Sequence, residues 1–316
     1  MSADKHSPPS PPTRTLLVGL SGPSCSGKTT LARFLRTIFT IPASASTHNR
    51  SITAFILHVD DFYKTDKDIP LITLAPPLPS GRTDTRTEQN WDCAESIDIA
   101  LLSRALGHVR STGQLPADLF SKEDQNEVGP APDVAQSLLA SLGEAVRAWL
   151  VGDSAAATTF GGDSAAATDI RIYFIDAFLL YTSPSPSPTT DSHSAAQLYA
   201  LSKLLDLKLW VSCSRRQMLD RRLRRRGYVT LETFWEDPPG YIEDVVWPEF
   251  LREHAWLVRE LDDGSSGGET RLVVDEEAAQ REGIVVAPEE EDGSVAPMRD
   301  LVSWATRAVE GRLNAR

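Results

Sequence analysis

The 316-residue chain has few cysteines, no long apolar run and no excess of positive charge. Its three cysteines, Cys25, Cys93 and Cys213, are far apart and lack metal-ligand spacing, so they predict reduced thiols in an intracellular protein. No apolar run approaches the length of a membrane span, and residues 1–13, rich in Pro and Ser, lack the apolar stretch of a signal peptide. We therefore expect a cytoplasmic protein, with the nucleus as an alternative location.

The charge balance narrows the classes of partner. The 44 acidic residues exceed the 32 basic ones, which leaves a net charge of −12. Such a balance argues against a broad nucleic-acid-binding surface and against an anionic membrane surface. We expect small-molecule ligands and a monomer or weak homodimer. The hydrophobic content of 41% is sufficient for a real core.

The segment Gly22-Pro23-Ser24-Cys25-Ser26-Gly27-Lys28-Thr29 matches the phosphate-binding pattern G-x-x-x-x-G-K-[ST]. Two glycines let the backbone turn so that its N–H groups point at phosphate oxygens. An apolar, strand-like run at 15–20 precedes the segment and a helix-like run at 29–39 follows it. The helix N-terminus adds partial positive charge at the phosphates. The pattern predicts ATP binding by Gly22, Ser24, Ser26, Gly27, Lys28, Thr29 and Thr30, with Mg²⁺ on the Thr29 hydroxyl.

Further apolar runs at 52–59, 170–175, 207–212 and 283–287 predict buried parallel strands, and 272–274 competes for the last place. Helices are expected over 133–150, 215–226, 241–261 and 298–313, and a loop over 69–87. The alternation predicts an α/β fold of three layers, with helices on both faces of a parallel sheet of about five strands and a small lid. We expect a disordered tail at 1–13 and one domain over 14–316. Insertions are expected at about 107–132, 151–169 and 182–194, the second containing a short duplicated segment.

Acidic residues follow two of the predicted strands, on the edge that also carries the phosphate loop. Asp176 closes its strand as a Walker B acid does and is expected to bind Mg²⁺. Asp60 and Asp61 end the second strand, and one of them is positioned to take the proton from an attacking hydroxyl. Neighbouring residues on an extended segment point to opposite sides, so we expect only one to face the site. An ordinary solvated acid is the alternative for each.

Two other sequences have both a structural and a functional interpretation. Asp92 begins the capping-box pattern Asp92-Cys93-Ala94-Glu95, which predicts a helix N-terminus, whereas Trp91-Asp92 also suits an aromatic wall beside a carboxylate for sugar hydroxyls. Positions 221–226 hold five arginines in six residues. We favour a lid that offsets phosphoryl charge over a solvated or nuclear-targeting run.

In combination, these motifs resemble nicotinamide riboside kinase in a fungal-type form, a relative of the uridine kinase-like P-loop kinases. The resemblance covers roughly 15–261. It rests on the phosphate loop, Asp60-Asp61-Phe62-Tyr63-Lys64, Trp91-Asp92, Asp176-Ala177-Phe178-Leu179-Leu180-Tyr181, Arg226-Gly227-Tyr228, Pro238-Pro239-Gly240-Tyr241 and Val246-Trp247-Pro248.

The resemblance implies Mg²⁺- and ATP-dependent phosphorylation of the ribose 5′-hydroxyl of nicotinamide riboside to nicotinamide mononucleotide. It implies Asp60 as the base, Asp92 on the ribose hydroxyls, Trp91 and Tyr228 on either side of the pyridinium ring, and Asp61 nearby. Lys28 and one or more of the lid arginines Arg222, Arg224, Arg225 and Arg226 would offset phosphate charge. An indole face attracts a cation more strongly than a phenol face does.

The chain departs from the family pattern at two places. Asp176 stands where the family commonly has Glu, and the extra residues 229–237 leave Trp235 or Phe234 as alternatives to Tyr228. Uridine, cytidine or pantothenate kinase activity is an alternative on the same fold. A regulatory module that binds ATP without transferring phosphate is the alternative from another class, suggested by the Ser/Pro and Gly/Ala insertions.

Overall fold

A computed structural model describes residues 13–45, 50–121, 134–151, 169–184, 193–225, 227–230, 232–262, 270–290 and 295–315. Nearly all of the tail at 1–13, and parts of each of the three expected insertions, lie outside these ranges. None of the helices within them combines the length and apolar character that crossing a lipid bilayer requires.

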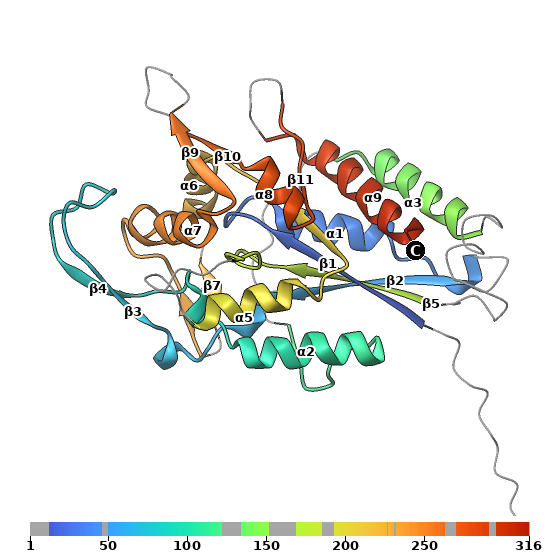
Figure 1. Ribbon diagram of the computed structural model, residues 1–316, viewed down its shortest axis with the longest axis horizontal. Coiled ribbons are helices and arrows are strands. Elements are labelled where there is room, and N and C mark those ends of the chain that lie inside the picture. Colours follow the sequence, from blue (N-terminus) through green and yellow to red (C-terminus); the bar gives the residue numbers. More distant parts are fainter. Residues whose placement is uncertain are drawn as a thin grey trace, which may run out of the picture.

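A five-stranded sheet forms the centre of the molecule (Figure 1). Its strands are β1 (Thr13–Ser21), β2 (Ser51–His58), β5 (Asp169–Asp176), β6 (Leu207–Trp210) and β11 (Ile284–Val286). They lie in the order β11-β6-β1-β5-β2, and every neighbouring pair is parallel. Continuous apolar runs suit strands that are buried on both faces. The predicted α/β fold with a parallel sheet is confirmed.

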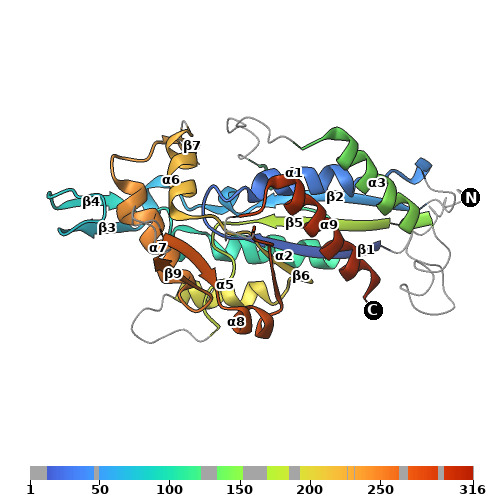
Figure 2. The ribbon, with the colours of Figure 1, turned by 90° about the horizontal axis from the view of Figure 1, so that it is seen from above.

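Helices cover both faces of this sheet (Figure 2). On one face α1 (Lys28–Ile38), α3 (Gln136–Val151) and α9 (Met298–Asn314) bury a core that includes Leu31, Leu35, Val146 and Val309. On the other face lie α2 (Ile99–Thr112) and α5 (His193–Ser202), whose Leu102 and Leu198 belong to a second core. Apolar residues on one side of each helix therefore produce the three layers.

Shorter elements connect and flank these layers. The helices among them are α6 (Arg215–Leu223), α7 (Trp247–His254), α8 (Glu276–Arg281), the π-helical turn η6 (Ile242–Val246) and the 3₁₀ turns η1 (Ala43–Ala45), η2 (Val59–Phe62), η3 (Asp66–Asp68) and η4 (Ala94–Ser96). Three antiparallel hairpins pair β3 (Leu71–Leu74) with β4 (Arg86–Gln89), β7 (Tyr228–Val229) with β8 (Phe234–Trp235), and β9 (Val258–Asp262) with β10 (Thr270–Val274).

Several expected boundaries are wrong. The stretch 69–87 contains β3 and the start of β4 instead of being all loop. The predicted helix at 241–261 ends at His254, because the following residues pair as β9 with β10, which also removes 272–274 from competition for the central sheet. Helix α2 extends to Thr112, past the expected start of an insertion at 107. In each case a contact between segments overrides the local pattern.

The helix start predicted at Asp92 is also wrong. The N-cap of α2 is Asp98, whose side chain accepts a hydrogen bond from the Leu101 N–H at 2.9 Å. Asp92 thus has no capping task on this helix, and its buried carboxylate has other partners.

Candidate active site

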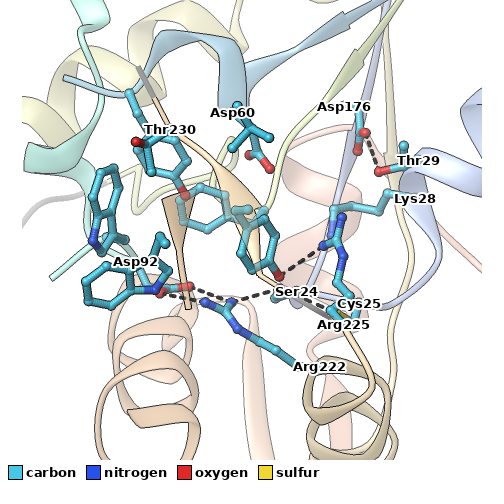
Figure 3. Close-up of a pocket in the computed structure, with 16 residues that line it drawn as sticks. Ser24, Cys25, Lys28, Thr29, Asp60, Asp92, Asp176, Arg222, Arg225 and Thr230 are labelled. Carbon is cyan, nitrogen blue, oxygen red and sulfur yellow. Dashed lines mark hydrogen bonds and ion pairs between the residues drawn. The ribbon is translucent and has the colours of Figure 1, made fainter. Parts of the chain in front are cut away.

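A pocket opens where β1, β2 and β5 end (Figure 3). The space inside it, counted together with the open solvent at its mouth, is about 750 Å³. One end is formed by the phosphate loop, through Ser24, Cys25, Lys28 and Thr29. The other end is walled by aromatic side chains. Ligands of α/β proteins commonly bind at this edge of the sheet.

The phosphate loop has the backbone that its glycines permit. Gly22 has φ +146°, and a Cβ there would lie 2.0 Å from the Val211 carbonyl oxygen, so only glycine fits. Gly27 has φ +99° and begins α1. The Lys28 ammonium donates to the carbonyls of Gly22 at 3.0 Å and Pro23 at 2.6 Å. Burial lowers the pKa of Lys28 from its usual value.

Asp176 lies beside Thr29, as the strand order requires. The Thr29 hydroxyl donates to Asp176 Oδ2 at 2.6 Å, and His58 Nδ1 lies 3.0 Å from the same oxygen. Residues His58 and Asp176 are register partners on β2 and β5. Burial alone would raise the pKa of the Asp176 carboxyl, but the hydrogen bond and charge of His58 outweigh it, and the pKa lies below its usual value. Asp176 is therefore held in its ionised form.

Asp60 and Asp61, the two acids after β2, lie in a short 3₁₀ turn and not on an extended backbone. Both belong to η2, which corrects the expectation that they point apart on a strand. Asp60 lines the pocket, between the phosphate loop and the aromatic wall, whereas Asp61 is not among the lining residues (Figure 3). Of the two, Asp60 is placed to meet a hydroxyl held next to the phosphates.

Aromatic rings form the far wall of the pocket. Trp91 is only 5% exposed; its ring centroid lies 5.3 Å from Tyr63 and 5.5 Å from Trp235. Tyr63 also stacks on Phe178 at 6.0 Å. Tyr228 lies under the Arg222 and Arg225 guanidiniums, whose carbons are 5.2 Å and 4.4 Å from its ring centroid. The wall presents several flat, electron-rich faces to one ligand.

Arg222 joins three parts of the site. Its guanidinium pairs with Asp237 (Nε–Oδ2 2.6 Å) and Asp92 (Nη1–Oδ1 3.1 Å), and it donates to the Ser24 hydroxyl at 3.0 Å. Burial would raise the pKa of Asp237, but the charge and hydrogen bonds of Arg222 lower it. Burial raises the pKa of Asp92, and Arg222 offsets this only in part. Arg222 is thus occupied by two buried carboxylates.

These contacts change the expected roles of the arginines. Arg222 was expected on ATP, but its guanidinium donates hydrogen bonds to two acids and a loop serine. Arg224, expected to be catalytic, is exposed and does not line the pocket. Arg225 does line it, and its Nη1 donates to the Tyr228 hydroxyl at 3.0 Å. Arg226 lies outside the described residues. Helix α6 ends at Leu223, so Arg222 lies within the helix and Arg224 and Arg225 follow it. The run of consecutive arginines does not indicate where the helix ends.

Comparisons with known proteins agree with this site. No family model matches the chain. Over 296 residues it is 28% identical to a nicotinamide riboside kinase of Schizosaccharomyces pombe, covering 94% of this chain and 96% of that protein. It is 26% identical over 245 residues to the Saccharomyces cerevisiae protein of that name (77% and 79% covered) and 28% identical over 248 residues to that of Eremothecium gossypii (78% and 79%). Over most of its length the chain is thus similar to three fungal nicotinamide riboside kinases.

A solved structure named "Structure of YGR205w protein" aligns with 66% of this chain and 68% of its own, at 15% identity and a TM-score of 0.29. At that level it carries no argument about the chain. The parallel sheet and the phosphate loop at its edge support the fold directly.

Most residues that the resemblance to nicotinamide riboside kinases indicated are brought together here. Those that line the pocket are Ser24, Lys28, Thr29, Asp60, Trp91, Asp92, Asp176, Arg222 and Tyr228. Gly22, Ser26, Gly27 and Thr30 belong to the loop and the first turn of α1. Trp235 lines the pocket in addition to Tyr228, while Phe234 is 54% exposed and does not.

Sequence reasoning missed His58 and Asp237 as parts of the site, whereas Arg225, one of the four lid arginines it named, does line the pocket. The role of His58 could have been predicted in part from the sequence, because it is the last residue of β2 and the strand order places it opposite Asp176. Asp237 gave no comparable signal, because its pairing with Arg222 depends on how the β7–β8 hairpin folds back.

Proposed function

We propose that this protein transfers the γ-phosphoryl group of ATP to the ribose 5′-hydroxyl of nicotinamide riboside, giving nicotinamide mononucleotide. One observation carries the proposal: a single pocket joins the phosphate loop, the acid Asp60 and an aromatic wall with a buried carboxylate. The names of the three fungal relatives support the same substrate.

The phosphoryl donor would lie along the loop and the N-terminus of α1. Backbone N–H groups of the loop and the partial positive charge of the helix suit the phosphates of ATP. Lys28 would exchange the carbonyls of Gly22 and Pro23 for phosphate oxygens. Arg225, which lines the same pocket, is the lid arginine that we propose offsets charge on the transferred group.

The acceptor would lie against Trp91, Trp235 and Tyr228. A pyridinium ring is a cation, and tryptophan faces attract cations by about 0.5–2 kcal/mol, depending on desolvation. The ribose hydroxyls would meet the carboxylate of Asp92, which Arg222 holds in place from one side. This arrangement directs the 5′-hydroxyl toward Asp60, which would accept its proton as the phosphorus–oxygen bond forms.

The donor atoms near Lys28 fit a magnesium ion. Thr29 and Asp176 present hard oxygen ligands 2.6 Å apart, and within the described ranges no cluster of three or more His, Cys, Asp or Glu is positioned to hold a metal. Mg²⁺ typically takes one or two protein ligands and completes its shell with phosphates and water. Thr29 and Asp176 would hold it, and its charge would stabilise the transferring phosphoryl group.

The substrate assignment is tested with purified protein and a panel of acceptors. ATP consumption is measured with nicotinamide riboside, uridine, cytidine and pantothenate at matched concentrations. We expect the highest kcat/KM with nicotinamide riboside. A preference of more than about tenfold for uridine or pantothenate, about 1.4 kcal/mol, would show that the substrate is wrong while leaving kinase activity intact.

His58 offers a test of the metal site. A His58→Phe variant removes the group that orients Asp176, and loss of such outer partners typically costs about 10–100-fold in metal affinity. We expect the Mg²⁺ concentration for half-maximal activity to rise by that factor, with saturating Mg²⁺ restoring most turnover. An unchanged Mg²⁺ requirement would remove His58 from this role.

A non-catalytic ATP-binding module explains the phosphate loop but not the opposite end of the pocket. Such a module needs no aromatic wall and no buried Asp92 beside Asp60. Calorimetric titration with nicotinamide riboside separates the two: a kinase binds it, and a simple nucleotide switch does not.

A further inference from the structure

One carboxylate, that of Asp66, is hydrogen-bonded to two residues of the β7–β8 hairpin. Asp66 Oδ2, in η3, accepts hydrogen bonds from the Thr230 hydroxyl at 3.1 Å and the Thr233 hydroxyl at 2.6 Å. These residues are 164 and 167 positions away along the chain. The hairpin also closes on itself, since the Thr233 N–H donates to the Thr230 hydroxyl at 2.9 Å. Hydrogen bonds to an ionised acceptor are the stronger kind.

Asp66 is itself tied to the segment that carries Trp91. Its backbone carbonyl accepts a hydrogen bond from the Gln89 side chain, and Gln89 ends β4. The Tyr241 hydroxyl donates to the Gln89 carbonyl at 2.9 Å and accepts from the Trp91 N–H at 3.0 Å. The position of Asp66 is therefore fixed relative to one wall of the pocket.

The hairpin supplies further side chains that line the pocket. Tyr228, Thr230 and Trp235, in or next to its two strands, all line the pocket (Figure 3 labels Thr230). Each of its strands is only two residues long. An isolated two-stranded hairpin is marginally stable in water, so a strand pair this short needs contacts outside itself to hold a defined place.

From these contacts we propose that Asp66 is a positioning residue that sets where the aromatic side chains of the hairpin lie relative to Trp91, which the Trp235 ring contacts at 5.5 Å. It acts through Thr233 and Thr230 on Tyr228 and Trp235, and so on the fit of a flat ring against these side chains. The inference rests on the proposed function for the identity of that ring, but the fastening of the hairpin can be measured without any substrate.

The first test is hydrogen exchange of the β7–β8 amides in the ligand-free protein. Asp66→Ala removes both hydrogen bonds to the hairpin and Thr233→Val removes the shorter one, whereas Thr233→Ser keeps the hydroxyl and Asp68→Asn alters an exposed acid of the same turn. We expect faster exchange of the hairpin amides in the first two variants and wild-type exchange in the second two. Unchanged exchange in Asp66→Ala and Thr233→Val would overturn the proposal.

The second test is kinetic. In Thr233→Val the KM for nicotinamide riboside is expected to rise about tenfold, the size that loss of a hydrogen bond to a charged group produces. We expect kcat and the KM for ATP to stay within about twofold, and Thr233→Ser to restore the nucleoside KM, a pattern that general destabilisation would not give. Equal nucleoside KM values for the Val and Ser variants would overturn the proposal. Wild-type protein that fails to use nicotinamide riboside would refute the proposed function, and exchange would still decide the role of Asp66.

Discussion

An Asp60→Ala variant is expected to lose nearly all turnover and still bind nucleotide. Asp60 is the acid after β2 that lines the pocket, whereas Lys28 and Thr29 of the phosphate loop donate hydrogen bonds to other residues, namely Gly22, Pro23 and Asp176. Loss of a positioned general base typically lowers the rate by about 10²–10⁴-fold. The measurement is kcat from ADP release, paired with calorimetric titration of a nonhydrolysable ATP analogue, whose affinity should change by less than about threefold, or 0.65 kcal/mol.

The neighbouring Asp61→Ala variant makes this comparison specific. Asp61 shares the same 3₁₀ turn but does not line the pocket, so its loss should cost far less turnover. If Asp60→Ala retained turnover, Asp60 would not be the base. If Asp61→Ala were the inactive variant, the base would be the adjacent carboxylate and the orientation of η2 would have to change on ligand binding.

Replacing Arg222 by methionine is expected to give the largest loss of stability. The side chains of Arg222, Asp92 and Asp237 are 6%, 6% and 13% exposed, so the variant would leave two carboxylates buried without their shared cation. Removing one partner of a buried ion pair costs about 3–5 kcal/mol. Urea denaturation of the variant and the wild type at pH 7 measures this difference in the free energy of unfolding.

The loss should depend on pH in a defined direction. In the wild type Arg222 keeps the pKa of Asp237 below its usual value, so this carboxylate stabilises the fold above that value, and its contribution is lost as pH falls. Without Arg222, burial raises the pKa of both carboxyls in the folded state. The folded variant then binds more protons than the unfolded chain, and its stability rises as pH falls from 7 to 5.

Arg224→Met is the matched control for this prediction. Arg224 is an exposed neighbour of the same residue type, and exposed substitutions usually change stability by no more than about 0.5 kcal/mol. A loss of less than about 1 kcal/mol in Arg222→Met, or a loss independent of pH between 5 and 7, would contradict the pairing that the structure contains.

Much of the fold was predictable because its main elements are locally encoded. The apolar runs that became β1, β5 and β6 are buried on both faces, and such strands are recognisable as uninterrupted hydrophobic segments, whereas Val285 of the edge strand β11 is 38% exposed. The phosphate loop was predictable for a similar reason. Gly22 and Gly27 adopt backbone angles that other residues rarely reach, so a short stretch of consecutive residues is enough to identify the loop.

The hairpins were not predictable in the same way. Strands β7 and β8 have two residues each, and β3 and β4 have four, which is too short for a periodic pattern to exceed chance. Strand β9 follows a helix without a glycine or proline to stop it, and only its pairing with β10 converts the segment to a strand.

The local pattern of residues thus established a parallel α/β sheet with a phosphate loop at its edge and named most of the acids and rings around the pocket. Which arginine faces inward, that Asp92 meets Arg222 and not a helix end, and that Trp235 joins the aromatic wall were settled by the folded chain. Those facts depend on side chains far apart in the sequence; Asp92 and Arg222, for example, are separated by 130 positions. Pairing over such distances follows from the path of the backbone between them, which neighbouring residues do not encode.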